Sequence, residues 1–166
     1  MRFLFLTAAR RGEARELPWS EIDGTDWHLP GARNKVKVNL TRPLSKAAIG
    51  VLEGLPRVEG SPFVFTSTGA APLHLGKPFA DLQEATGIKN WRLHDIRRSS
   101  RTLLARAGVN ADIAERCLGH VVGSVQRIYN RHNFHREMAE AYEKLASLIE
   151  NIVHPSSHRV GKLRVV

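Results

Sequence analysis

The segment W91-R-L-H-D-I-R-R-S-S-R-T-L-L-A-R-A-G108 carries two different stripes at helical spacing, and it constrains the fold more than any other part of the chain. The apolar stripe comprises Ile96, Leu103, Leu104 and Ala107. The basic stripe comprises His94, Arg97, Arg98 and Arg101. This spacing predicts a helix from about 94 to 107 that buries one side and offers the other to an anion. Helical arginines are more often solvated surface residues, so the basic stripe alone does not define a site.

The remaining pattern predicts mainly helices and a small antiparallel sheet, that is, an α+β fold. We expect further helices over residues 2–17, 45–55, 79–85, 110–118, 125–129 and 135–152. Short strands are expected around 27–29, 35–40 and 63–65, where apolar residues alternate or cluster between Gly, Pro and Asn. We predict one domain over residues 1–152 and a basic C-terminal tail over 153–166.

The charge balance favours an anionic partner. The 166 residues include 18 Arg and 7 Lys against 16 acidic residues, a formal net charge of +9. Phosphate neutralisation makes nucleic acid the leading partner class, and a generically basic protein is the alternative. No segment has the roughly 20 apolar residues of a membrane helix, so no membrane partner is expected. The single cysteine, Cys117, falls on an apolar helical stripe and indicates a small buried side chain in a reducing, cytoplasmic setting.

A metal site and a DNA-reading helix-turn-helix unit are two further interpretations of the sequence. The eight histidines include no paired His/Cys cluster with ligand spacing, so no metal site is predicted. The segment 103–119 has the helix, glycine-centred turn and second helix of a DNA-reading helix-turn-helix unit. Any helical hairpin needs that pattern, which leaves an ordinary structural hairpin as the alternative.

Five motifs in order along the chain resemble the catalytic domain of the tyrosine recombinases, the phage integrases. They are T7-A-A-R-R-G-E13, R33-N-K-V-K-V-N-L-T-R-P-L-S45, H94-D-I-R97, L118-G-H120 and Tyr129, nine residues after the histidine. The resemblance implies six catalytic residues: Arg10, Lys35, His94, Arg97, His120 and Tyr129. It also implies that Glu13 supports Arg10, while Arg98, Arg101, Arg127 and Arg131 face DNA phosphates or solvent. Lys37 lies two residues from Lys35, and Ala8 stands where the first motif usually has glycine.

The resemblance implies site-specific DNA recombination or integration by strand cleavage and rejoining through a 3′-phosphotyrosyl intermediate, without cofactor or metal. Double-stranded DNA and a homotetramer on DNA would be the partners. Residues 135–166 would either pass to a neighbouring protomer or pack on their own domain. The family has another helix and a DNA-binding domain before the first motif, so we expect a domain truncated at its N-terminus. The alternatives are an inactive DNA-binding remnant of a prophage integrase and a DNA-relaxing enzyme of the same chemistry.

Overall fold

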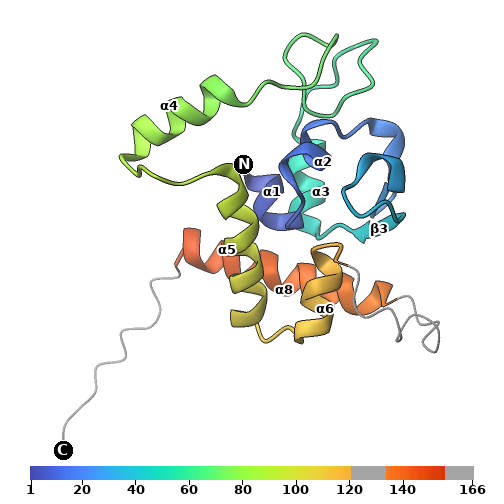
Figure 1. Ribbon diagram of the computed structural model, residues 1–166, viewed down its shortest axis with the longest axis vertical. Helices are drawn as coiled ribbons and strands as arrows, with labels where there is room; N and C mark the ends of the chain where they lie inside the picture. Colours follow the sequence, from blue (N-terminus) through green and yellow to red (C-terminus); the bar gives the residue numbers. More distant parts are fainter. Residues whose placement is uncertain (121–133, 156–166) are drawn as a thin grey trace, which may run out of the picture.

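A computed structural model describes residues 1–120 and 134–155 of the chain (Figure 1). Its helices and strands, in order, are α1 (Arg2–Thr7), α2 (Arg11–Arg15), η1 (Trp19–Glu21), β1 (Ile22–Asp23), β2 (Asp26–Leu29), η2 (Gly31–Arg33), β3 (Leu40–Pro43), α3 (Lys46–Glu53), α4 (Gly76–Thr86), α5 (Leu93–Arg106), α6 (Ala111–Cys117) and α8 (His135–Val153). The predicted class, mainly α with a small antiparallel sheet, is confirmed. The expected helix over 125–129 lies outside the described residues.

Two apolar clusters hold these elements together. The larger one joins α1, the sheet, α3 and the start of α5 around Phe3 and the fully buried Trp27. The smaller one joins α5, α6 and α8 around Leu104, Cys117 and Tyr142. Helix α8 contacts α1, α3, β3, α5 and α6; in Figure 1 it lies below α1, α3 and β3 and crosses α5. The helix predicted at 135–152 therefore packs against its own domain.

The expected helix over residues 2–17 is wrong, because the chain breaks between α1 and α2. Ala8 adopts a left-handed conformation with φ of 49°, and this conformation ends α1. Arg10 then has an extended backbone and precedes α2 as its N-cap. The break directs the Ala8 carbonyl towards α5, where the Arg97 side chain donates a hydrogen bond to it.

The sheet has the order β1-β2-β3 with both pairs antiparallel; β2 lies where a strand was expected, and β3 overlaps the end of another expected strand. The strand predicted at 35–40 begins at Leu40 instead. The buried Asn34 donates to the carbonyls of Pro30 and Val38 and accepts from the amide of Val36. Such side-chain bonds to the backbone replace ladder bonds and close residues 34–38 into a turn.

The strand predicted at 63–65 is also wrong. This segment forms an isolated bridge between Pro18 and Phe63 and does not join the sheet. The amide of Trp19 donates to the Pro62 carbonyl, and the amide of Val64 donates to the Leu17 carbonyl. Pro62 has no amide hydrogen, so it cannot return a ladder bond to the Trp19 carbonyl.

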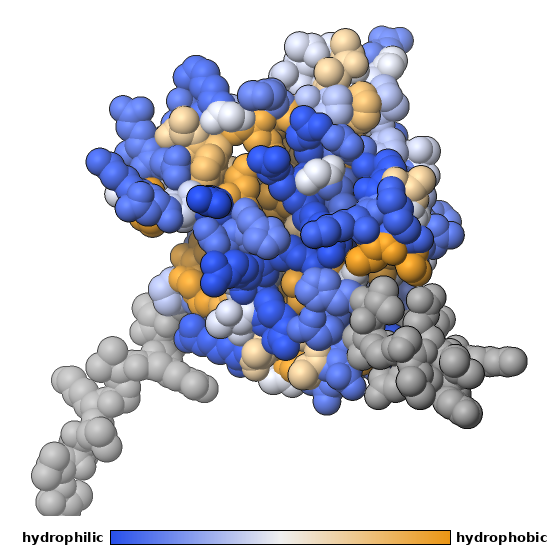
Figure 2. All heavy atoms as spheres, viewed as in Figure 1, coloured by the Kyte–Doolittle hydropathy of each residue, from blue (hydrophilic) through white to orange (hydrophobic). Residues whose placement is uncertain are grey.

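Two predicted helix caps are confirmed. The Ser45 hydroxyl accepts from the Ala48 amide at the start of α3, and the Asn110 side chain accepts from the Asp112 amide at the start of α6. Helix α4 behaves differently, because it has no buried residue and projects from the domain. Figure 2 shows apolar side chains in the hollow between α4 and the rest of the domain. Within the described residues, no helix is long and apolar enough to cross a membrane.

Candidate active site

Arg10 and Glu13 form a closed pair at the start of α2. The Arg10 amide donates to Glu13 Oε2 at 3.1 Å, and Arg10 Nη1 donates to Glu13 Oε1 at 2.8 Å. The Arg10 side chain is 21% exposed and the Glu13 side chain only 3%. The carboxylate therefore fixes the guanidinium from the buried side and leaves part of it open to a ligand.

A second arginine, Arg42 on β3, approaches the same carboxylate from inside the domain. Its Nη2 lies 3.7 Å from Glu13 Oε2, and its side chain is fully buried. Burial alone would raise the pKa of Glu13, but the charge of Arg42 and the bonds from Arg10 bring that pKa below its ordinary value. Glu13 is therefore ionised at neutral pH.

Arg42 is held from two further sides. Its guanidinium lies 4.7 Å from the centre of the Trp27 ring. Its Nε donates to the Tyr142 hydroxyl at 3.1 Å, and that hydroxyl donates to the Cys117 carbonyl at 2.6 Å. Burial raises the pKa of Tyr142, so this phenol stays protonated. Arg42 therefore connects the first motif to α6 and α8.

Arg97 lies on the buried side of α5, although the sequence placed it in the basic stripe. Its Nη1 donates to the Ala8 carbonyl and its Nη2 to the Leu118 carbonyl, each at 2.6 Å. Arg97 thus joins the end of α1 to the end of α6. Burial, followed by repulsion from Arg10 and Arg42, lowers the pKa of Arg97 to about 10, so the guanidinium keeps its charge at neutral pH.

His120 follows α6 and meets Arg97 at the same place. His120 Nε2 lies 3.1 Å from Arg97 Nη2, and His120 Nδ1 lies 2.5 Å from Glu115 Oε2. The other oxygen of Glu115 accepts from Arg101 Nε at 2.8 Å. Two of the predicted catalytic residues therefore touch, and Arg101, predicted to face phosphate or solvent, pairs with an acid.

Two predicted residues stand apart from this cluster. His94 and Lys35 are exposed, and among the described residues neither forms a hydrogen bond with Arg10, Arg97 or His120. Lys35 lies in the turn after η2, while Lys37, with φ of 55°, donates to the Ala32 carbonyl. Arg98 is exposed and pairs with Asp95 at 3.2 Å. Tyr129, Arg127 and Arg131 lie outside the described residues.

Sequence reasoning missed Arg42 and Glu115. Strand alternation places Arg42 on the same face as Leu40, so the pattern carried a signal that this arginine points inward. Glu115 precedes His120 by five residues, and only the turn after α6 brings the two together. That contact has no simple periodic signature.

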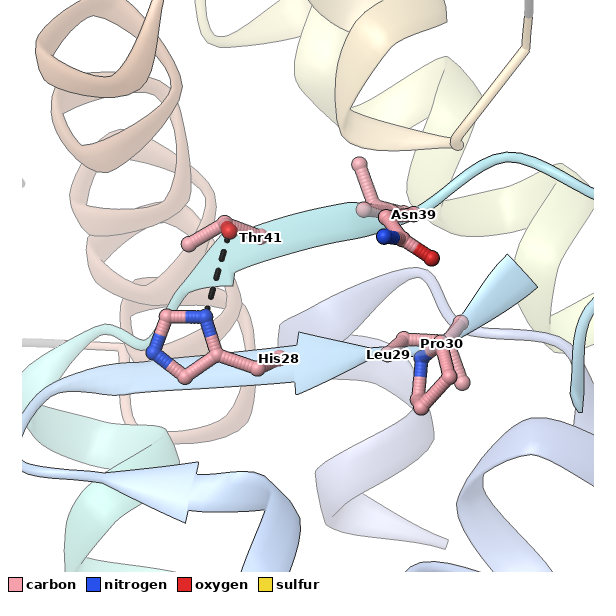
Figure 3. Close-up of a pocket in the computed structure, with 6 residues that line it drawn as sticks. His28, Leu29, Pro30, Asn39 and Thr41 are labelled. Carbon is pink, nitrogen blue, oxygen red and sulfur yellow. Dashed lines mark hydrogen bonds between the residues drawn. The ribbon is translucent and has the colours of Figure 1, made fainter. Parts of the chain in front are cut away.

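A separate hollow of about 250 Å³ lies on the outer face of β2 and β3. Figure 3 shows His28 and Thr41 side by side across the two strands, with Nδ1 and Oγ1 3.2 Å apart. Leu29, Pro30, Asn39 and Leu40 complete its lining. None of the clustered site residues reaches it. Among the described residues, no group of three or more His, Cys, Asp or Glu side chains is placed to hold a metal.

Comparison with known proteins shows to which family this chain belongs. Residues 1–136 match the phage integrase family. The prophage integrase IntA of Escherichia coli (strain K12) is 32% identical over 152 residues, which cover 87% of this chain and 37% of that protein. The chain belongs to the phage integrase family.

Solved integrase structures share the fold. The integrase of mycobacterium phage Brujita superposes with a TM-score of 0.64 at 20% identity, covering 86% of this chain and 50% of that one. A lambda integrase (75–356) dimer bound to a COC′ core site gives a TM-score of 0.59 at 22% identity, covering 75% and 50%. A lambda integrase tetramer bound to a Holliday junction gives 0.59 at 21%, covering 74% and 40%. The chain therefore spans half or less of the length of these relatives.

Proposed function

We propose that this chain carries the catalytic centre for site-specific cleavage and rejoining of double-stranded DNA, with Tyr129 as the nucleophile. The observation that carries the proposal is that Arg97 contacts His120 and lies close enough to Arg10 for their charges to repel, with Glu13 buried behind Arg10. A cationic pocket built on rigid guanidinium groups suits a phosphodiester.

Each clustered residue has a distinct part in this proposal. Arg10, partly exposed, binds a non-bridging oxygen of the scissile phosphate directly. Arg97, already fixed by two carbonyls, presents the edge of its guanidinium beside His120. The five-coordinate transition state carries extra charge on those oxygens, so losing either arginine should slow cleavage about 10²–10³-fold, as for one preorganised oxyanion donor.

The reaction forms a bond between the Tyr129 phenolate and phosphorus and breaks the bond from phosphorus to the 5′-oxygen. An ordinary phenol with a pKa of about 10 is about one part in a thousand ionised at neutral pH, a cost of about 4 kcal/mol. The cationic pocket recovers part of that cost. Lys35 protonates the leaving 5′-oxygen and His94 assists proton transfer. Attack by another strand's 5′-hydroxyl on the phosphotyrosyl link reverses the step, which needs no cofactor.

DNA and further copies of the chain are the proposed partners. The lambda integrase structures are a dimer on a core site and a tetramer on a Holliday junction, and we propose a tetramer on DNA here also. The exposed Arg98, with Arg127 and Arg131, would contact phosphates. Helix α8 contributes Tyr142 and Leu145 to the core of its own domain in this single chain, and the exchange of residues 135–166 between protomers stays a prediction.

A suicide duplex with a randomised core tests this function for any target sequence. The duplex carries a nick a few nucleotides 3′ to the cleavage positions that the core offers, and the 5′ end of the cleaved strand is labelled with fluorescein. Cleavage releases a short 5′-hydroxyl fragment that diffuses away, and the labelled fragment stays on the protein. A denaturing gel then shows a covalent adduct, and sequencing the trapped DNA gives the preferred core.

The variants Tyr129→Phe and Tyr142→Phe separate the two tyrosines of the chain. We expect the adduct to disappear in Tyr129→Phe and to persist in Tyr142→Phe, because the Tyr142 hydroxyl is bonded in the core. An adduct that survives Tyr129→Phe contradicts the nucleophile assignment. Salt-sensitive binding of the duplex without an adduct supports the DNA-binding remnant instead.

A further inference from the structure

A single carboxylate, Glu115, connects two helices to the candidate site. It lies on α6 and accepts from Arg101 Nε of α5 through one oxygen, while its other oxygen lies 2.5 Å from His120 Nδ1. His120 Nε2 in turn faces Arg97 Nη2 at 3.1 Å. The result is a continuous row of side chains, Arg101–Glu115–His120–Arg97, that ends at a residue of the site.

The two contacts of His120 select one form of its ring. A guanidinium has only N–H donors, so the ring nitrogen that faces Arg97 must be the acceptor. An ionised carboxylate has only acceptors, so the nitrogen that faces Glu115 must carry the hydrogen. The bond from Arg101, then the contact with His120, lowers the pKa of Glu115 and keeps it ionised. The neutral ring is therefore the Nδ1–H tautomer, whereas free imidazole side chains favour hydrogen on Nε2.

We propose that Glu115 is a positioning residue, which Arg101 holds in place and which fixes His120 as the Nδ1–H tautomer with Nε2 facing the phosphate site. The catalytic consequence rests on the proposed function. When a DNA phosphate takes the place of the Arg97 contact, Nε2 takes up a proton from solvent and donates it in a hydrogen bond to a non-bridging oxygen. Glu115 keeps the Nδ1 hydrogen throughout and balances the charge of the imidazolium.

The arrangement requires a carboxylate of this length. Two donors, Arg101 Nε–H and His120 Nδ1–H, converge on the two oxygens of Glu115. A glutamine offers one acceptor oxygen and turns its NH₂ group towards one of the donors. An aspartate is one methylene shorter and cannot keep both contacts without moving α6. Glu115→Gln is therefore the informative substitution, because it changes hydrogen bonding and charge at almost constant volume.

Asp112 offers a matched control on the same helix. Its side chain is exposed in the first turn of α6, one helical turn from Glu115. Asp112→Asn changes the net charge by the same amount as Glu115→Gln. Any effect that comes only from the general attraction between a more basic protein and DNA appears equally in both variants.

The tautomer is measured on the full chain without DNA. Long-range ¹H–¹⁵N correlation spectra at a pH where the imidazole is neutral distinguish Nδ1–H from Nε2–H, and His120→Gln assigns the ring signals. We expect Nδ1–H in the unmodified protein and in Asp112→Asn, and a shift towards Nε2–H in Glu115→Gln. An Nε2–H ring in the unmodified protein, or the same tautomer in Glu115→Gln, would overturn the inference.

A second measurement separates positioning from a merely structural tie between α5 and α6. The rate of adduct formation on the nicked duplex, at saturating protein, should fall about tenfold in Glu115→Gln, less than the roughly 10²-fold loss of a direct donor. Asp112→Asn should retain the unmodified rate. A changed tautomer with an unchanged rate refutes the positioning role. If the unmodified protein forms no adduct, the proposed function fails, while the tautomer measurement still decides the role of Glu115.

Discussion

Replacing Arg97 by alanine should destabilise the domain, in addition to any effect on the proposed DNA cleavage. Arg97 Nη1 and Nη2 donate to the carbonyls of Ala8 and Leu118, and both bonds are 2.6 Å long in a buried setting. A bond from a charged donor contributes about 1.5–3 kcal/mol, so the two together contribute about 3–6 kcal/mol. The folded protein also bears the cost of desolvating the Arg97 charge, and removing the charge removes that cost, which offsets part of the lost stability. We expect a net loss of about 3 kcal/mol in the free energy of unfolding.

The adjacent residue provides the control. Arg98 lies on the same helix, but its side chain is 77% exposed and pairs with the nearby Asp95 across 3.2 Å. Arg98→Ala should therefore change the free energy of unfolding by less than about 0.5 kcal/mol. Urea unfolding, followed by tryptophan fluorescence, measures both variants. With a slope of about 2 kcal/mol per molar urea, the Arg97→Ala midpoint should fall by about 1.5 M. Equal midpoints for the two variants would refute the reasoning that Arg97 clamps the two carbonyls.

Three further predictions concern the first motif and the core. The pKa of Glu13 is lowered below its ordinary value of 4.5, so its ionisation stabilises the fold above that pH, and this stabilisation is lost as the pH falls through the lower folded value. Glu13→Gln should therefore flatten the acid side of a plot of unfolding free energy against pH. An unchanged acid side would contradict this. Ala8→Gly removes a buried methyl but relieves a φ of 49°. Its free energy of unfolding, measured with urea, should therefore exceed that of Ala9→Gly by about 1–2 kcal/mol, the cost of a left-handed residue. Burial raises the pKa of Cys117 to about 12, so the thiol should react with a thiol-specific disulfide reagent only after denaturant is added, and rapid reaction of the folded protein would refute its burial.

Local chemistry made several elements predictable. The helix from 93 to 106 follows from its apolar spacing and from Gly108 beyond its end, and Ser45 and Asn110 cap the helices that follow them. The order of the integrase motifs along the chain was equally visible. These features depend on residues a few positions apart, so the sequence alone determines them.

Other features depend on partners far along the chain, and only the tertiary structure decided them. The helix expected over 2–17 breaks at Ala8, whose freed carbonyl is bound by Arg97, 89 residues away. The strand expected at 35–40 becomes a turn because the Asn34 side chain competes successfully for the backbone.

The same division applies to the candidate site. The resemblance to the integrase motifs predicted Arg10, Glu13, Arg97 and His120 as site residues, because each lies in a short motif. It could not show that Arg42 lies buried behind Glu13 or that Glu115 contacts His120, since only the folded core brings β3 and the end of α6 next to these residues. The sequence determined which charged groups are available to the candidate site. Packing decided which of them are desolvated and paired, because burial and hydrogen-bond partners are properties of neighbours in space.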